Sequence, residues 1–136
     1  MIIDTQKDPD FISLINFLFS FDFDCKDIIK KQLQTAIVKK EKSDYHIAFR
    51  FYVDTFQEPL PASFCGQPPA VFGIPVAIEV KNGEDHTCCE LFVGHQYIIE
   101  YRLYNINATA LNMENFWKGT AHFIYNPPHR RTPGDS

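Results

Sequence analysis

Histidine is the residue type in this sequence best suited to proton transfer and metal binding near neutral pH. The chain of 136 residues contains five histidines: His46, His86, His95, His122 and His129. None of them stands at a recognised catalytic or metal-ligand spacing from another candidate ligand. We therefore expect no catalytic residue, no metal site and no cofactor.

The four cysteines offer thiol chemistry without a known motif around them. Cys65 lies in a proline-rich segment, where an accessible thiolate could act as a nucleophile activated by His46 or His95. No nucleophile signature surrounds it, so an inert loop cysteine is the favoured interpretation. The others lack disulfide-scaffold spacing and are expected to be free thiols in a reducing compartment: Cys25, Cys88 and Cys89. Adjacent strand residues such as Cys88 and Cys89 should face opposite sides of a sheet.

Asp22, Asp24 and Asp27 form a short acidic segment that could share a divalent cation. A second interpretation requires no metal ion. Asp24 and Asp27 lie where a helix should begin, and acids are favoured there by capping and by the helix dipole. Capping is therefore the expected role.

Charged residues on successive strands suggest a contact surface on one face of a sheet. Arg50, Glu79, Glu90, Glu100 and Arg102 all fall on polar positions of strands and can form cross-strand pairs. Such residues need only solubilise an open face. Two tyrosines on that face add the amphipathic rings typical of interfaces. The candidate binding residues are Arg50, Tyr52, Arg102 and Tyr104, with the segment 55–70 at their rim.

Two helices are expected near the N-terminus. Asp8 can cap a helix that starts at Pro9 and runs to about Ser20, with an apolar stripe widened by Ile12 and Phe17. A second helix should begin after Asp24. Its core face is formed by Cys25, Ile28, Ile29, Leu33 and Ala36.

Alternating apolar residues predict strands over 45–53, 74–81, 87–93 and 96–105, with β structure also from about 35 and a last edge strand over 120–125. In the first, the residues expected to face the core are Tyr45, Ile47, Phe49, Phe51 and Val53. In 96–105, Ile99 and Tyr101 are expected inside, and Ile98 outside. Asn82-Gly83 and Gly94-His95 are tight-turn signals that make these strands an antiparallel meander.

Prolines and glycine exclude regular structure from 55–70, and one helical turn is expected around 113–117. The predicted fold class is α+β, with two N-terminal helices packed on one face of a five- to six-stranded antiparallel sheet. Residues 1–126 should form a single domain, followed by a flexible C-terminal tail over 127–136.

The formal net charge of −4 disfavours nucleic acid as a partner, because such affinity comes from clustered Lys and Arg. Lys26, Lys30 and Lys31 are better explained as a solvated helix face. The N-terminal residues lack the pattern of a signal peptide, and no apolar stretch is long enough to span a membrane. A cytoplasmic protein is expected.

The order of elements over residues 15–106 resembles small uncharacterised bacterial domains, some of which accompany toxin and immunity loci. The segments that carry the likeness are residues 74–79, the Gly83 turn, residues 91–93 and residues 99–104. This chain departs from the resemblance at Gly94-His95-Gln96, where such domains usually have a glycine before the last strand. The resemblance implies the α+β fold and a bacterial cytoplasmic source. The exposed charged and tyrosine-bearing strands, together with the lack of a coherent catalytic set, favour a non-enzymatic protein-interaction module, immunity-like in role. The alternative is a small-molecule-binding or hydrolytic domain with a cone-like curved sheet.

Overall fold

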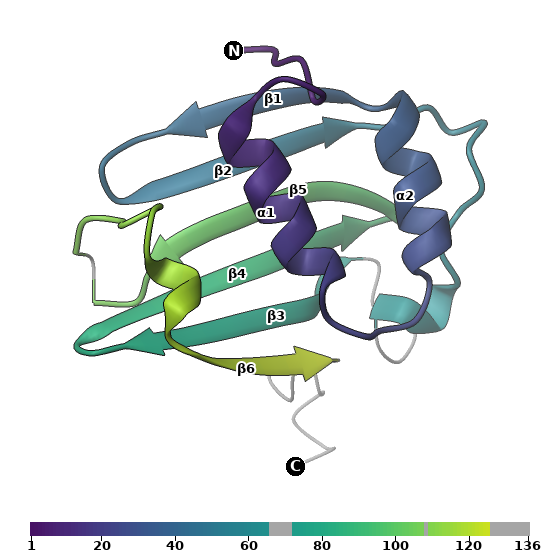
Figure 1. Ribbon diagram of the computed structural model, residues 1–136. Helices are drawn as coiled ribbons and strands as arrows, with labels where there is room; N and C mark the ends of the chain where they lie inside the picture. Colours follow the sequence, from purple (N-terminus) through teal and green to yellow (C-terminus); the bar gives the residue numbers. More distant parts are fainter. Residues whose placement is uncertain (66–71, 108, 126–136) are drawn as a thin grey trace.

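The computed structural model describes residues 1–65, 72–107 and 109–125, and it confirms the α+β class (Figure 1). The helices are α1 (Pro9–Phe19) and α2 (Lys26–Thr35), with short 3-10 helices η1 (Ala62–Cys65) and η2 (Phe116–Lys118). The strands are β1 (Ile37–Lys42), β2 (His46–Tyr52), β3 (Phe72–Asn82), β4 (Asp85–Gly94), β5 (Tyr97–Asn105) and β6 (Thr120–Tyr125). They form a six-stranded antiparallel sheet in the order β1-β2-β5-β4-β3-β6. The predicted tail, 127–136, and residues 66–70 of the predicted loop lie outside the described residues.

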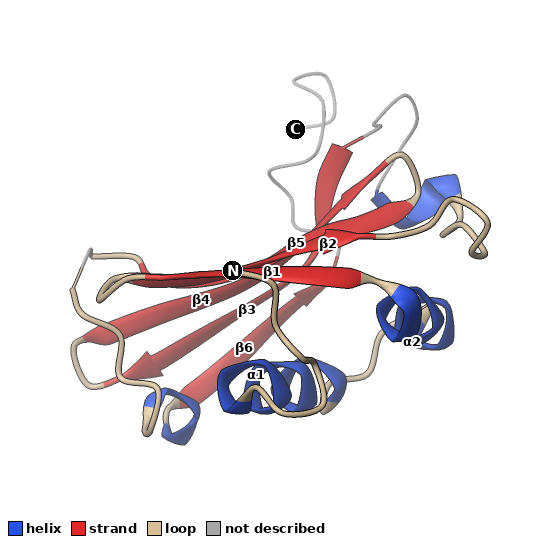
Figure 2. Cartoon of the chain, turned by 90° about the horizontal axis from the view of Figure 1, so that it is seen from above, coloured by secondary structure: helices blue, strands red, loops and turns tan. Residues whose placement is uncertain are grey.

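Helices α1 and α2 lie on the same side of the sheet, as Figure 2 shows. Their apolar stripes and the facing side of the strands form the core. The predicted inward residues Phe49, Phe51, Ile78 and Tyr101 are all buried. We call this side of the sheet the inner face and the opposite side the open face. Among the described residues, no helix is long and apolar enough to cross a membrane.

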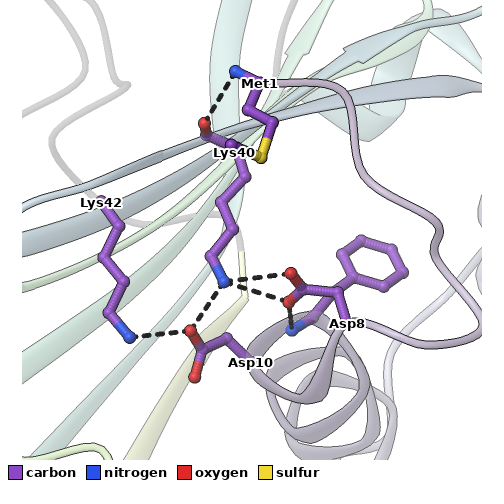
Figure 3. Close-up of polar contacts among 6 residues, drawn as sticks. Met1, Asp8, Asp10, Lys40 and Lys42 are labelled. Carbon is purple, nitrogen blue, oxygen red and sulfur yellow. Dashed lines mark hydrogen bonds and ion pairs between the residues drawn. The ribbon is translucent and has the colours of Figure 1, made fainter.

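Helix α1 begins as predicted and is fixed to the edge strand β1 by charge (Figure 3). The Asp8 carboxylate caps the helix by accepting a hydrogen bond from the Phe11 amide at 2.9 Å. The Lys40 ammonium lies 3.1 Å from Asp8 and 2.7 Å from Asp10, and Lys42 lies 2.9 Å from Asp10. Ile12, predicted to widen the apolar stripe, is instead 38% exposed, because the buried stripe of α1 is formed by Phe11, Leu14 and Leu18.

Helix α2 does not start as the sequence suggests. The predicted Asp24 cap is wrong, because the N-cap position is taken by Cys25, which has φ 68° and no side-chain capping bond. The Lys26 ammonium instead ties down the preceding turn, donating to the carbonyl oxygens of Phe19 and Phe21 at 2.9 and 2.7 Å. Asp27 does lie in the first helical turn, where the helix dipole favours an acid.

The alternation of buried and exposed residues in β5 shifts within the strand, which corrects the predicted placement of two isoleucines. Phe92 pairs with Glu100 but Val93 pairs with Ile98, so Ile99 is an extra residue in the ladder. This bulge buries Ile98 completely and leaves Ile99 37% exposed. Tyr45 is a second correction, because β2 starts one residue later and Tyr45 is 57% exposed.

The proline-containing segment is more ordered than predicted within its described part. Leu60 and Phe64 are buried, and residues 62–65 form η1. The backbone amide of Leu60 donates to the Gln96 carbonyl at 2.7 Å, and the Gln96 side chain donates back to the Leu60 carbonyl at 2.8 Å. The buried side chains and these two hydrogen bonds fix the segment to the end of the sheet.

Candidate functional site

The four predicted contact residues lie on the open face of two neighbouring strands, Arg50 and Tyr52 on β2, Arg102 and Tyr104 on β5. They do not form one compact patch. Tyr104 pairs with His46, six residues before Tyr52, so the two tyrosines are about 20 Å apart along the strands. Between them lies a row of charges.

A chain of ion pairs crosses the open face from β1 to β4. Arg50 lies 3.8 Å from Glu41 and 3.5 Å from Glu100. Arg102 lies 3.8 Å from Glu100 and 3.6 Å from Glu90. Each guanidinium is therefore placed between two carboxylates. The predicted cross-strand pairs form between Arg50 and Glu100 and between Arg102 and Glu90, whereas Glu79 lies beside His86 instead.

The two ends of this chain differ in accessibility. The Arg102 guanidinium lies 4.7 Å from the centroid of Phe92 and 5.5 Å from that of Tyr104, and its side chain is 39% exposed. Tyr104 is half-buried, and burial, followed by the charge of Glu90, raises the pKa of its hydroxyl. The Arg50 side chain is 53% exposed and Tyr52 is 49% exposed. The accessible half of the predicted site is thus its β2 half.

Exposed apolar residues continue from the β2 half of the predicted site across the ends of the neighbouring strands. Ile37, 54% exposed, pairs with Tyr52 on the neighbouring strand. Phe72, 60% exposed, and Ile99 both lie against the Cα of Gly94, where a Cβ would contact their side chains. Sequence reasoning missed this apolar row, because the bulge that exposes Ile99 and the early start of β3 at Phe72 leave no signal in the hydrophobic alternation.

A second group of polar side chains gathers where β3 and β4 form their hairpin. Cys88 lies directly opposite Glu79, and its Sγ is 3.9 Å from a Glu79 carboxylate oxygen. His86 Nε2 is 3.6 Å from the other oxygen. His86 precedes the predicted strand 87–93, but β4 starts at Asp85 and places His86 on the open face. The Asn82-Gly83 turn fixes this register, so the hairpin pattern was the signal that could have brought the three residues together.

The described thiols are free and protonated at neutral pH. Burial, then the charges of Glu79 and Glu90, raises the pKa of Cys88 to about 11. Burial also raises the pKa of Cys89 and that of Cys25. Cys89 faces the inner side and Cys88 the open face, so the two face opposite sides of the sheet as predicted. A protonated thiol is a poor nucleophile, so these three do not support thiol catalysis. The side chain of Cys65 lies outside the described residues.

A shallow, open depression of about 510 Å³ lies at the start of α2. Its lining comes from one continuous segment, residues 23–28, and includes Asp24 and Asp27 but no histidine. It is therefore different from the cavity between helices and sheet that a cone-like ligand-binding domain requires. Helix α1 lies over the inner face, with Leu14 and Leu18 buried there.

No protein-family model, no curated protein and no solved structure matches this chain. The resemblance to small bacterial domains stays a prediction. The function must be inferred from the two surfaces just described.

Proposed function

We propose that this protein is a non-enzymatic protein-interaction module, immunity-like in role, that binds a protein partner through the open face of its sheet. The observation that supports this most is the row of exposed apolar side chains at the strand ends, formed by Ile37, Tyr52, Ile99 and Phe72. Solubility of an open sheet face requires polar residues, and apolar side chains grouped on such a face are typical of contact sites.

The surroundings of this apolar row fit a protein interface. The Lys39 ammonium lies 5.2 Å from the centre of the Tyr52 ring, and Arg50 lies one pair further along the same face. An apolar centre with a charged rim is the usual arrangement of a non-obligate interface. We expect Tyr52 to contribute most to affinity, since tyrosine is enriched among residues that dominate binding energy.

The test is affinity capture from the native host with the whole chain as bait, followed by binding measurements with the purified partner. Tyr52→Ser should weaken binding by at least about 10-fold, the effect of losing one interface residue worth about 1.4 kcal/mol. Ile12→Ser is the matched control, because Ile12 is an exposed apolar residue on α1, on the other side of the molecule. Circular dichroism should show both variants folded.

An unchanged Kd for folded Tyr52→Ser would place the site elsewhere. Capture of no specific partner, together with turnover of a small molecule by the purified chain, would refute the interaction module itself.

A further inference from the structure

The side chains of Glu79, His86 and Cys88 gather on the open face of the β3–β4 hairpin, separate from the apolar row. Their ligand atoms, one from each residue, all lie within 4.8 Å of one another. A carboxylate, an imidazole and a thiolate are the three side-chain types that zinc sites in proteins use. From this geometry we infer that the hairpin binds a divalent transition-metal ion of the zinc type.

The distances are close to those that a tetrahedral ion requires. Zinc bonds of about 2.0–2.3 Å at tetrahedral angles put neighbouring ligand atoms roughly 3.3–3.6 Å apart. The structure has 3.6 Å between His86 Nε2 and Glu79, and 3.9 Å between Cys88 Sγ and Glu79. These two distances run to different oxygens of Glu79, and the three ligand atoms lie within 4.8 Å of one another, so side-chain shifts of about 1 Å would bring them onto one ion. The ligands stand on paired strands, so their backbones are already fixed by the hairpin ladder.

Cys88 donates a hydrogen bond to Glu79, so His86 is the member of this group that lacks a partner without an ion. His86 Nε2 is shielded from solvent, yet it has no hydrogen-bond partner among the described residues. Its 3.6 Å separation from Glu79 is too long for a hydrogen bond. A buried polar atom without a partner needs an explanation, and a bound cation supplies one.

Solvent access suits a three-ligand site. Cys88 is only 5% exposed, whereas the side chains of Glu79 and His86 are 32% and 27% exposed. An ion held by the three would be closed off on the sheet side and open toward solvent, where water takes the fourth position. On binding, Cys88 loses its thiol proton to solvent as the sulfur–metal bond forms.

Cobalt(II) is the probe, because a cobalt–thiolate bond gives a charge-transfer absorption that oxygen and nitrogen ligands do not. The whole chain, freed of metal with a chelator, should bind one equivalent of Co²⁺ with this absorption, and Zn²⁺ should remove it. Cys88→Ser should abolish the band, and His86→Gln should weaken Co²⁺ binding by at least about 10-fold, since even outer-shell partners typically contribute that much. Cys25→Ser is the control and should bind as the unchanged chain does.

The proposal is overturned if the unchanged chain gives no charge-transfer band, or if the band persists in Cys88→Ser. A band lost in Cys25→Ser would equally contradict it. Circular dichroism identifies variants that do not fold. If Cys88→Ser does not fold, His86→Gln, which changes a partly exposed side chain, tests the site in its place. None of these measurements requires a protein partner.

Discussion

Gln32 is a single polar residue that links three parts of the structure. It is fully buried on α2, and its amide donates to the Glu58 carbonyl at 2.9 Å. Its side-chain oxygen accepts a hydrogen bond from the Ile98 amide at 2.9 Å. The donor is the buried residue beside the β5 bulge, so Gln32 satisfies a backbone group in the interrupted part of the ladder.

We expect Gln32→Met to lower the free energy of unfolding by about 1–3 kcal/mol, because it leaves the Ile98 amide and the Glu58 carbonyl without partners in the interior. Urea unfolding measures this. Gln34→Met is the control, since Gln34 is exposed on the same helix and its replacement should change stability by less than about 0.5 kcal/mol. Equal effects of the two substitutions would show that the buried bridge contributes nothing.

Residue-scale details of this kind were only partly predictable. Phe49 and Tyr101 follow a simple alternation and were placed correctly. Ile98, Ile99 and the αL residue Cys25 were not, because bulges and helix starts depend on tertiary contacts. Nothing local in the sequence distinguishes a buried glutamine from an exposed one.

At the scale of elements, α1 is held to β1 by the ion pairs of Asp10 with Lys40 and Lys42 (Figure 3). Burial alone would raise the pKa of Asp10, but the hydrogen bonds and charges of Lys40 and Lys42 outweigh it and lower this pKa below 3.8. At Lys40, burial alone would lower the pKa, but the hydrogen bonds and charges of Asp10 and Asp8 outweigh it and raise this pKa above 10.5. Both shifts favour the folded state at neutral pH.

The signs of these shifts predict opposite pH limits. The Asp10 contribution is present above pH 3.8 and is lost as the pH falls below that value; the Lys40 contribution is present below pH 10.5 and is lost above it. Urea unfolding across pH should therefore show a shallower acid limb for Asp10→Asn. Asp22→Asn, which changes an exposed carboxylate outside this group, should follow the unchanged chain. Parallel acid limbs for all three proteins would contradict the anchoring role.

Both helices, the meander and the last edge strand were predictable at this scale, because helical and period-two apolar spacing and turn residues are local signals. The sheet order was not. β6 joins the edge beside β3 after a long excursion through η2, and only its pairing with residues 76–81 reveals this.

At the scale of the whole molecule, the two faces of the sheet have different roles. The inner face is covered by α1 and α2 (Figure 2), while the open face carries the ion-pair chain, the apolar row and the Glu79, His86 and Cys88 group. The four predicted contact residues do share the open face of β2 and β5. The extent of the accessible surface was not predictable, because the rings and carboxylates that contact Arg102 and the bulge that exposes Ile99 arise from register.

The most direct test of the open face as the contact surface is hydroxyl-radical footprinting of the chain, free and bound to its purified partner. In the free chain, Tyr52 should be oxidised and the buried Tyr101 protected. Partner binding should protect Tyr52 and Phe72, while Trp117, which is 44% exposed on η2, keeps its labelling. Protection of Trp117 with unchanged labelling of Tyr52 would contradict the account.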